Sequence, residues 1–384
     1  MPAATRPSLA QALDAAWQRS LDATQTQGQQ RVARADEAAA RSWLAAPPAL
    51  QVAQRQGRGP AADGQRETEV GVALPLWRLG ARATAGDAAQ AELDWAQAAE
   101  QAARLRLAGE VREALGLLLS LEAEQGLATL RAQLLQRLAD DVDRRVQAGD
   151  LAPADALAAR AEWLASQAQA ADAQQKLRQQ QAQWQLLTGW ALAAEPEPER
   201  PDAGAPLDDA HPELQLTARA VERAQRKLAL VQAQRGENPE LGVHLRQERP
   251  GTGSPTQHSV GIALRLPFGA GAQAQPRIAA ALAEVDLALT HQQRTRDRLA
   301  ADLALARGQW HAAQALTQLE AQRATLLRTR AQHIDKAFQA GEAPLPELLR
   351  ALDAAAQAEA ARDRQAVQLR LAQARLLQAQ GLLP

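Results

Sequence analysis

The sequence predicts a mainly α-helical protein with a small β part, and three observations lead to this fold class. Alanine, leucine, glutamine, arginine and glutamate fill whole blocks of the 384 residues, as is typical of long helices packed along alanine seams. Two proline-free stretches, about 81–152 and about 277–343, each predict a helix on the order of 90 Å long. A short alternating phrase precedes each stretch, VGVALPLW from Val70 and VGIALRLPF from Val260.

The chain reads as an internal duplication. Besides the two strand phrases, PPALQVAQRQ from Pro47 matches NPELGVHLRQ from Asn238, and VDRRVQAGDLAPADAL from Val142 matches IDKAFQAGEAPLPELL from Ile334. Collinear matches at a nearly constant offset indicate two copies of one structural unit. We therefore predict a first repeat over 1–192, a linker rich in proline, glycine and acidic residues over 193–211, and a second repeat over 212–384.

Each repeat is expected to contain the same elements in the same order. A first helix (roughly 9–45 and 212–236) leads into a β-hairpin, about 48–77 in the first copy and 239–268 in the second. A long helical hairpin follows, with its tip at about 149–153 and 341–346, and helices return over about 154–190 and 346–380. Gly149 and Gly341 are expected to end the outgoing helices in the left-handed conformation.

The long stretches favour coiled-coil-like packing. In the second one, apolar residues between Leu282 and Ala313 largely keep a spacing of three and four. An ordinary helical bundle is the alternative.

The strands are compatible with a membrane. Val70, Val72 and Leu74 alternate with small residues, and each strand segment is about 8 to 11 residues long, the span of a tilted membrane strand. Four strands cannot close a barrel and an open edge is not tolerated in lipid, whereas three copies would supply twelve strands. The alternative is a soluble four-stranded sheet with one face buried on a helix.

Trp77 and Phe268 occupy matched positions where strand gives way to long helix, as expected of aromatic anchors at a membrane interface. They suit a core plug at the junction equally well. With two Phe and no Tyr in the chain, an aromatic girdle would be thin.

Composition argues against several function classes. The formal net charge of −1 with interspersed signs disfavours nucleic acid, and the absence of cysteine excludes disulfides, thiolate catalysis and Cys-ligated metals. The six histidines have no metal-ligand spacing, so we expect no metal site, no cofactor and no enzymatic activity. Alternation places His244 toward the interior of a barrel, where it could meet passing cations, although a lone histidine is more often unspecialised.

The duplicated plan, the strand phrases and the tip motif A-G-x-x-x-x-x-[DE]-x-L together resemble the TolC family of outer-membrane efflux proteins, over nearly the whole chain. The wording SWLAAPPALQVAQRQ followed by GQRETEVGVALPLW is most similar to the CzcC-like branch, which serves metal-efflux pumps of the resistance-nodulation-division class.

This resemblance implies a homotrimer whose 12-stranded outer-membrane barrel continues into a helical barrel through the periplasm. A periplasmic adaptor (membrane fusion) protein would dock at the helical tips and link the duct to an inner-membrane resistance-nodulation-division pump. The protein would be a passive exit duct, and the CzcC-like branch implies heavy-metal cations as cargo.

The resemblance also implies site residues. The adaptor-contacting tips correspond to Gly149, Asp150 and Leu151, and to Gly341, Glu342 and Ala343. The channel gate corresponds to Asp155 and Glu347, although a carboxylate in the first turn of a helix is also favoured by the helix dipole alone. Arg350 stands where some relatives carry a second gate acid, which departs from the pattern.

Two alternatives remain open at this point: the exit channel of a type I protein secretion system, and a soluble periplasmic coiled-coil adaptor. The first residues lack a charged region followed by an apolar one, and they lack a lipid-accepting cysteine. An outer-membrane location therefore implies that a targeting segment has been removed.

Overall fold

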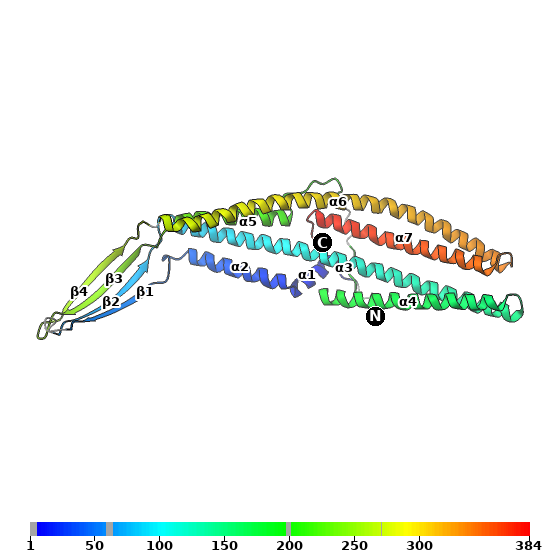
Figure 1. Ribbon diagram of the computed structural model, residues 1–384, viewed down its shortest axis with the longest axis horizontal. Coiled ribbons are helices and arrows are strands. Elements are labelled where there is room, and N and C mark those ends of the chain that lie inside the picture. The colour runs from blue at the N-terminus through cyan, green and yellow to red at the C-terminus, as the bar shows by residue number, and fades with distance from the viewer. Residues whose placement is uncertain (1–5, 59–63, 197–200, 270) are drawn as a thin grey trace. The chain divides into compact units, whose positions relative to one another are not determined.

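The computed structural model describes residues 6–58, 64–196, 201–269 and 271–384. The elements are α1 (Leu9–Arg19), α2 (Leu21–Ala40), β1 (Ala49–Gln56), β2 (Arg66–Pro75), α3 (Ala81–Ala148), α4 (Pro153–Thr188), α5 (Pro212–Ala233), β3 (Glu240–Arg249), β4 (Gln257–Arg265), α6 (Gly271–Gln339) and α7 (Leu345–Ala379) (Figure 1). The predicted class, mainly α with a small β part, is confirmed. In the part of the chain that the structure describes, none of the helices combines the length and the hydropathy needed to cross a membrane.

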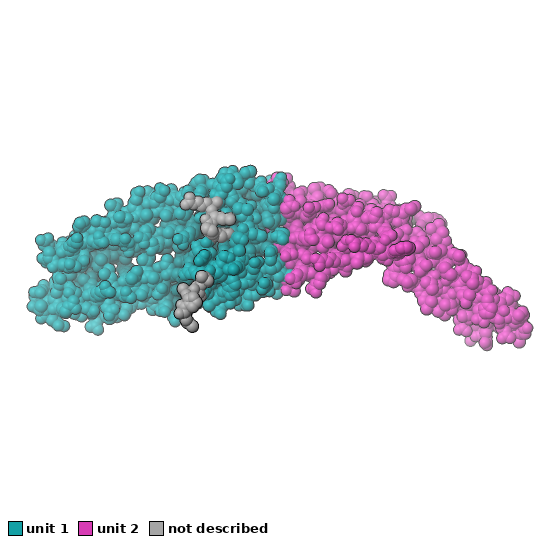
Figure 2. All heavy atoms as spheres, turned by 180° about the vertical axis from the view of Figure 1, so that it is seen from behind, with its two compact units in different colours: residues 1–23, 101–212, 297–384 teal, residues 24–100, 213–296 magenta. Residues whose placement is uncertain are grey.

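The chain folds into two compact units, shown in different colours in Figure 2. The first unit comprises residues 1–23, 101–212 and 297–384, and the second comprises residues 24–100 and 213–296. Both units take residues from both sequence repeats, and the two repeats themselves stay an interpretation of the sequence.

The second unit contains a single antiparallel sheet with strand order β1-β2-β3-β4. The register places Leu50, Val72, Val243 and Ile262 in one row across all four strands, and the next row is Gln51, Gly71, His244 and Gly261. At the end of the sheet where the helices follow, the Leu76 N–H donates to the Pro239 carbonyl over 2.7 Å. The central pair, β2 and β3, joins the two hairpins predicted from the sequence.

Charged and aromatic contacts hold the helices of the second unit together. The Arg223 guanidinium of α5 lies 4.1 Å from the ring centre of Trp95 on α3 and pairs with Glu92 over 3.4 Å. Lys227 of α5 pairs with Glu284 of α6 over 2.8 Å. In this unit α5 is therefore fixed to the first part of both long helices.

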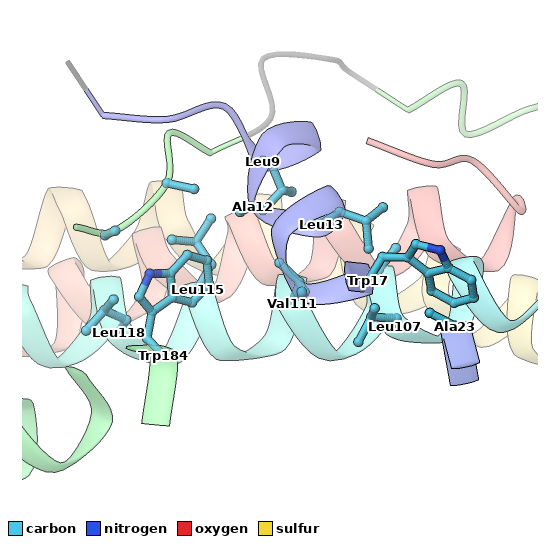
Figure 3. Packing of buried hydrophobic residues seen from close by; sticks show 14 of the residues in the cluster. Leu9, Ala12, Leu13, Trp17, Ala23, Leu107, Val111, Leu115, Leu118 and Trp184 are labelled. Atoms are coloured by element: carbon cyan, nitrogen blue, oxygen red, sulfur yellow. The ribbon is translucent and has the colours of Figure 1, made fainter. Parts of the chain in front are cut away.

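The first unit has its main core around two tryptophans. Leu9, Leu13 and Trp17 of α1 pack against α3 residues from Leu107 to Leu118, as Figure 3 shows. Trp184 of α4 is fully buried in the same cluster, and its indole N–H donates to the Leu192 carbonyl over 3.0 Å. Each of these two large aromatic rings removes a large apolar area from water.

Side-chain contacts give the helices of the first unit the order α4, α3, α7, α6, which Figure 1 also shows. The Gln180 amide of α4 donates to the Ala114 carbonyl of α3 over 3.2 Å. Arg375 of α7 reaches Glu113 of α3 with Nε–Oε1 and Nη2–Oε2 distances of 2.6 and 2.9 Å, and this hydrogen bonding raises the pKa of the arginine. Arg328 of α6 pairs with Glu359 of α7.

Two boundaries differ from the expected ones. The single first helix expected over about 9–45 is two helices, because the Ser20 hydroxyl donates to the Trp17 carbonyl and accepts from the Ala23 N–H, which ends α1 and starts α2. The second long helix begins at Gly271 rather than after Pro276, and this proline lies inside α6. A proline near a helix start removes one backbone hydrogen bond without ending the helix.

Candidate functional site

The first candidate surface is the polar face of the sheet. Glu67 on β2 forms an ion pair with Arg246 on β3, with 2.9 Å between Oε1 and Nε, and Arg55 on β1 lies 3.8 Å from the same oxygen. Arg246 also pairs with Glu248 over 3.2 Å. The Glu67 side chain is only 16% exposed, so this network is partly shielded from water and ties three strands together.

His244 lies on the same polar face, flanked by Gly71 and Gly261 in its row. A Cβ added at Gly261 would lie 2.2 Å from the imidazole Nε2, which shows that the ring rests over this glycine. His244 therefore lies on the polar face of the sheet, and Gly261 leaves room for its imidazole.

The opposite face of the sheet is apolar and exposed in the three rows nearest the helices, whereas the next row on that face, Gln54, Thr68, Gln247 and His258, is polar. The apolar side chains share two properties, a place on alternate strand positions and exposure to solvent in the single chain, and they are Leu50, Val52, Val70, Val72, Val243, Leu245, Val260, Ile262 and Leu264. A contiguous apolar face of this kind marks an interaction surface. These apolar side chains are exposed in the single chain, so the alternation of apolar residues along the strands does not come from packing against a helix of the second unit.

The predicted aromatic positions lie at the end of the sheet where the helices begin. Phe268 is 96% exposed, whereas Trp77 is half-buried and its indole N–H donates to the Ser42 carbonyl over 3.0 Å. Trp43, next to that carbonyl, is 88% exposed and was not singled out from the sequence. The available signal for Trp43 was its place in the short connection between α2, which ends at Ala40, and β1, which begins at Ala49.

The two tip turns have the predicted backbone geometry. Gly149 and Gly341 have φ of 86° and 78°, which confirms the left-handed conformation expected for them. The Asp150 N–H donates to the Arg145 carbonyl and the Glu342 N–H to the Ala337 carbonyl, each over 2.8 Å. This pattern is the Schellman closure of a helix, and it leaves the first two residues of each turn exposed.

The third turn residues, Leu151 and Ala343, are partly buried against a cluster that contains Val142, Phe338 and Leu348. This cluster takes side chains from the tip ends of α3, α4, α6 and α7. Both tip turns therefore pack against the same apolar cluster.

The candidate gate acids occupy first turns of helices. The Asp155 carboxylate accepts from the Ala152 N–H over 3.3 Å at the start of α4. Glu347 lies in the first turn of α7 and is exposed, and Arg350 one turn later donates to the Pro346 carbonyl over 3.1 Å. Asp155 thus has a helix-capping contact, while the Glu347 side chain projects from the surface.

Sequence reasoning missed the contact that joins the two tips. The Arg145 guanidinium lies 4.9 Å from the ring centre of Phe338 and donates to the Phe338 carbonyl over 3.4 Å. Arg145 also pairs with Asp141 over 3.0 Å. The available signal was the aromatic residue of the second tip motif, which stands where the first copy has Val146.

A groove of about 930 Å³ lies between the helical hairpins of the first unit, lined by α3, α4, α6 and α7. Figure 2 shows this unit hollowed between its helices. Arg131 of α3 crosses to Asp353 of α7 over 2.6 Å among the lining residues. Among the described residues, no group of three or more His, Asp or Glu side chains is placed to hold a metal ion.

Comparison with solved structures identifies the fold. The outer membrane protein VceC from Vibrio cholerae superposes with a TM-score of 0.77 at 18% identity, over 97% of this chain and 96% of that chain. The fold is TolC-like. A membrane protein from Pseudomonas aeruginosa gives a TM-score of 0.79 at 18% identity over 97% of this chain and 90% of its own.

The outer membrane channel CmeC from Campylobacter jejuni has the TolC-like fold as well, with a TM-score of 0.76 at 13% identity over 97% of this chain and 85% of its own. No family model and no curated protein matches the sequence. At these identities the likeness shows the fold, and function has to be argued from the surfaces described above.

Proposed function

We propose that this chain is the outer-membrane exit duct of a tripartite efflux system and works as a passive homotrimer without catalysis. The observation that carries the proposal is the sheet of the TolC-like fold. It has exposed apolar rows on one face, a charge network on the other face, and two edges that are unpaired among the described residues. Lipid would cover the apolar face, and Glu67, His244 and Arg246 would face an aqueous lumen.

The trimer follows from the strand edges. β1 and β4 have no partner on their outer sides within the described chain, and unpaired backbone groups are not tolerated in lipid. Three copies give twelve strands, an even number suited to a closed barrel. CmeC, OprN and MtrE are outer-membrane channels, and this supports the same role for a chain of the same fold.

The partners of the proposed duct are a periplasmic adaptor and an inner-membrane resistance-nodulation-division pump. The exposed turn residues would contact the adaptor, and they are Gly149, Asp150, Gly341 and Glu342. Leu151 and Ala343 would hold the two turns in place by packing against the apolar cluster at the tips. The finer proposal, a CzcC-like channel that passes heavy-metal cations, rests on the sequence wording around Trp43 and Val70. A duct that prefers anions in the conductance measurement below would contradict the cation cargo.

The location and assembly are tested by expressing the chain with an added secretory leader in a Gram-negative host. We expect the protein in the outer-membrane fraction, with the mass of three chains after extraction in mild detergent. A well-folded monomer that stays in the soluble periplasmic fraction would contradict the duct and favour a soluble coiled-coil protein. Co-purification with a secretion ATPase instead of a pump would assign the channel to protein secretion.

The gate proposal predicts an effect of Glu347→Gln. Three exposed carboxylates near a threefold axis would concentrate cations at the narrow end, most strongly at low salt. In planar bilayers we expect the variant to lose a large part of the cation preference measured at low salt. Asp155→Asn should have a smaller effect, because that carboxylate already caps α4.

Glu342→Gln is the matched control, since it removes an exposed acid from the adjacent turn rather than from α7. Equal conductance and selectivity in Glu347→Gln, Glu342→Gln and the unmodified channel would show that Glu347 does not contribute to a gate.

A further inference from the structure

The sheet face that carries the apolar rows, called the outer face below, changes character at the end away from the helices. Beyond the apolar rows and the polar row next to them, this face ends in a last row that consists of Gln56, Arg66 and Arg249. Figure 1 shows this end, where each hairpin turns, as the end of the sheet farther from the helices. Two arginines therefore follow the apolar rows on the same side of the sheet.

The two arginines are neighbours in space. Arg66 of β2 is directly opposite Arg249 of β3 in the register. Side chains at such positions have Cβ atoms about 4.5–5.5 Å apart, and like charges there destabilise a sheet. Both arginines are exposed, and neither forms an ion pair with any of the residues that the structure describes. An anion from outside the chain would remove the repulsion between them.

The acidic side chains of the strands lie on the other face. Glu67 and Glu248 pair with Arg246 on the polar face. The four strands are described over their whole length, and their outer face carries no acidic residue. His258 and Gln247, in the adjoining row of the outer face, supply further polar groups. This part of the outer face is therefore suited to an anion.

The position along the strand places the arginines at the rim of the membrane in the proposed duct. Val72, in the middle one of the three apolar rows, is six residues from Arg66, which is roughly 20 Å along a strand. At a strand tilt of 35–45°, this length is roughly 15 Å along the bilayer normal, whereas the apolar band of such a barrel extends roughly 12 Å from its centre. The guanidinium groups would therefore lie at the level of the lipid headgroups.

The two ends of the apolar rows differ in chemistry. At the helix end the exposed side chains include the aromatic residues Trp43 and Phe268, which suit a membrane interface without selecting a charge. At the hairpin end stand Arg66 and Arg249, and a guanidinium group donates two parallel hydrogen bonds to a phosphate. The hairpin end is therefore the one suited to a specific headgroup.

We propose that Arg66 and Arg249 bind the phosphate of a lipid whose headgroup carries a phosphate monoester, in the leaflet that surrounds the hairpin end of the barrel. This proposal rests on the proposed duct and adds a lipid-binding site to its rim. A phosphate monoester carries close to two negative charges at neutral pH, which two guanidinium groups can balance. A zwitterionic phosphodiester headgroup offers less net charge to the pair.

The occupant is a lipid because the arginines adjoin apolar rows. Val70, Leu245 and Val260 form the apolar row nearest to Arg66 and Arg249, with one polar row between. One lipid molecule can therefore place its phosphate on the guanidinium groups and its acyl chains along the apolar rows. A free phosphate ion would use the first contact alone.

Lipid A, a glycolipid with phosphate monoester groups, is the probe. The detergent-extracted trimer of the full chain, freed of lipid, is titrated with lipid A in neutral-detergent micelles, and binding is followed by native mass and by the midpoint of thermal unfolding. Arg66→Gln with Arg249→Gln should bind lipid A roughly tenfold more weakly or worse, because charge-assisted hydrogen bonds are lost. Arg66→Lys with Arg249→Lys should keep part of the affinity, since the charge remains without the bidentate geometry.

The matched control is Arg277→Gln with Arg294→Gln, which removes the same charge from exposed positions of α6 and should leave lipid A binding unchanged. Inorganic phosphate, and micelles doped with phosphatidylcholine, should raise the unfolding midpoint much less than lipid A does. Equal stabilisation by either of them, or unweakened lipid A binding by a trimer of the double glutamine variant, would overturn the lipid site and leave the duct intact. A native mass of one chain for the unmodified protein would overturn both.

Discussion

Replacing Ile262 by arginine is expected to abolish stable assembly of the channel in the outer membrane. Ile262 is exposed and lies in the row Leu50, Val72, Val243 and Ile262 that crosses the apolar face of the sheet. An arginine on the lipid face of a membrane barrel costs about 2–4 kcal/mol near the bilayer centre, and a trimer would carry three of them. We expect little or no trimer in the outer-membrane fraction, measured by gel mobility without heating.

The neighbouring residue provides the control. Ala263 lies on the polar face, opposite Gly242, so Ala263→Arg would project the same charge into the aqueous lumen. This variant should assemble close to the unmodified level. If Ile262→Arg forms trimers as readily as Ala263→Arg, the apolar face does not meet lipid, and the duct proposal loses its main support.

The strands could be predicted from the sequence because their alternation is local. Val70, Val72 and Leu74 show their common face without any knowledge of neighbouring strands. The pairing of β2 with β3, which places Val72 beside Val243, depends on residues far apart in the chain. No local pattern specifies a register between distant strands, so the sheet order emerged only from the structure.

The helix boundaries likewise could be predicted where a local pattern specifies them and could not where it does not. Gly149 and Gly341 could be assigned because a left-handed residue at a helix end is a local requirement that glycine meets without strain. The break at Ser20 was not predicted, since a serine inside a helical pattern is common. It ends α1 where Trp17 packs into the core with Leu107 and Val111.

The candidate site was predicted only in part. The tip residues and the acids Asp155 and Glu347 came from matching a motif, whereas the contact of Arg145 with Phe338 joins residues from the two halves of the chain. Motif matching shows which residue types recur and leaves their partners in space unknown. The gate and adaptor roles therefore stay predictions until the conductance and docking of variants are measured.

Replacing Gly116 by valine is expected to destabilise the packing of α7 on α3 by about 1–3 kcal/mol, the usual cost of overpacking a core. Gly116 lies on α3 beside the buried side chain of Leu371, and a Cβ at Gly116 would lie only 2.0 Å from Leu371 Cδ2 and 2.7 Å from its Cγ. The leucine would have to leave its position, or the helices would have to separate. A lower midpoint of thermal unfolding for the detergent-extracted protein would show the effect.

Gly126 on the same helix is the control, because a Cβ there would meet no atom within 4 Å. Gly126→Val should change stability little, since valine and glycine differ by only a few tenths of a kcal/mol in helix propensity. Leu371→Ala should recover part of the loss when combined with Gly116→Val but should destabilise the unmodified chain, because only the valine variant lacks room for the leucine. Equal unfolding midpoints for the two glycine variants would mean that α7 does not pack against α3 at this point.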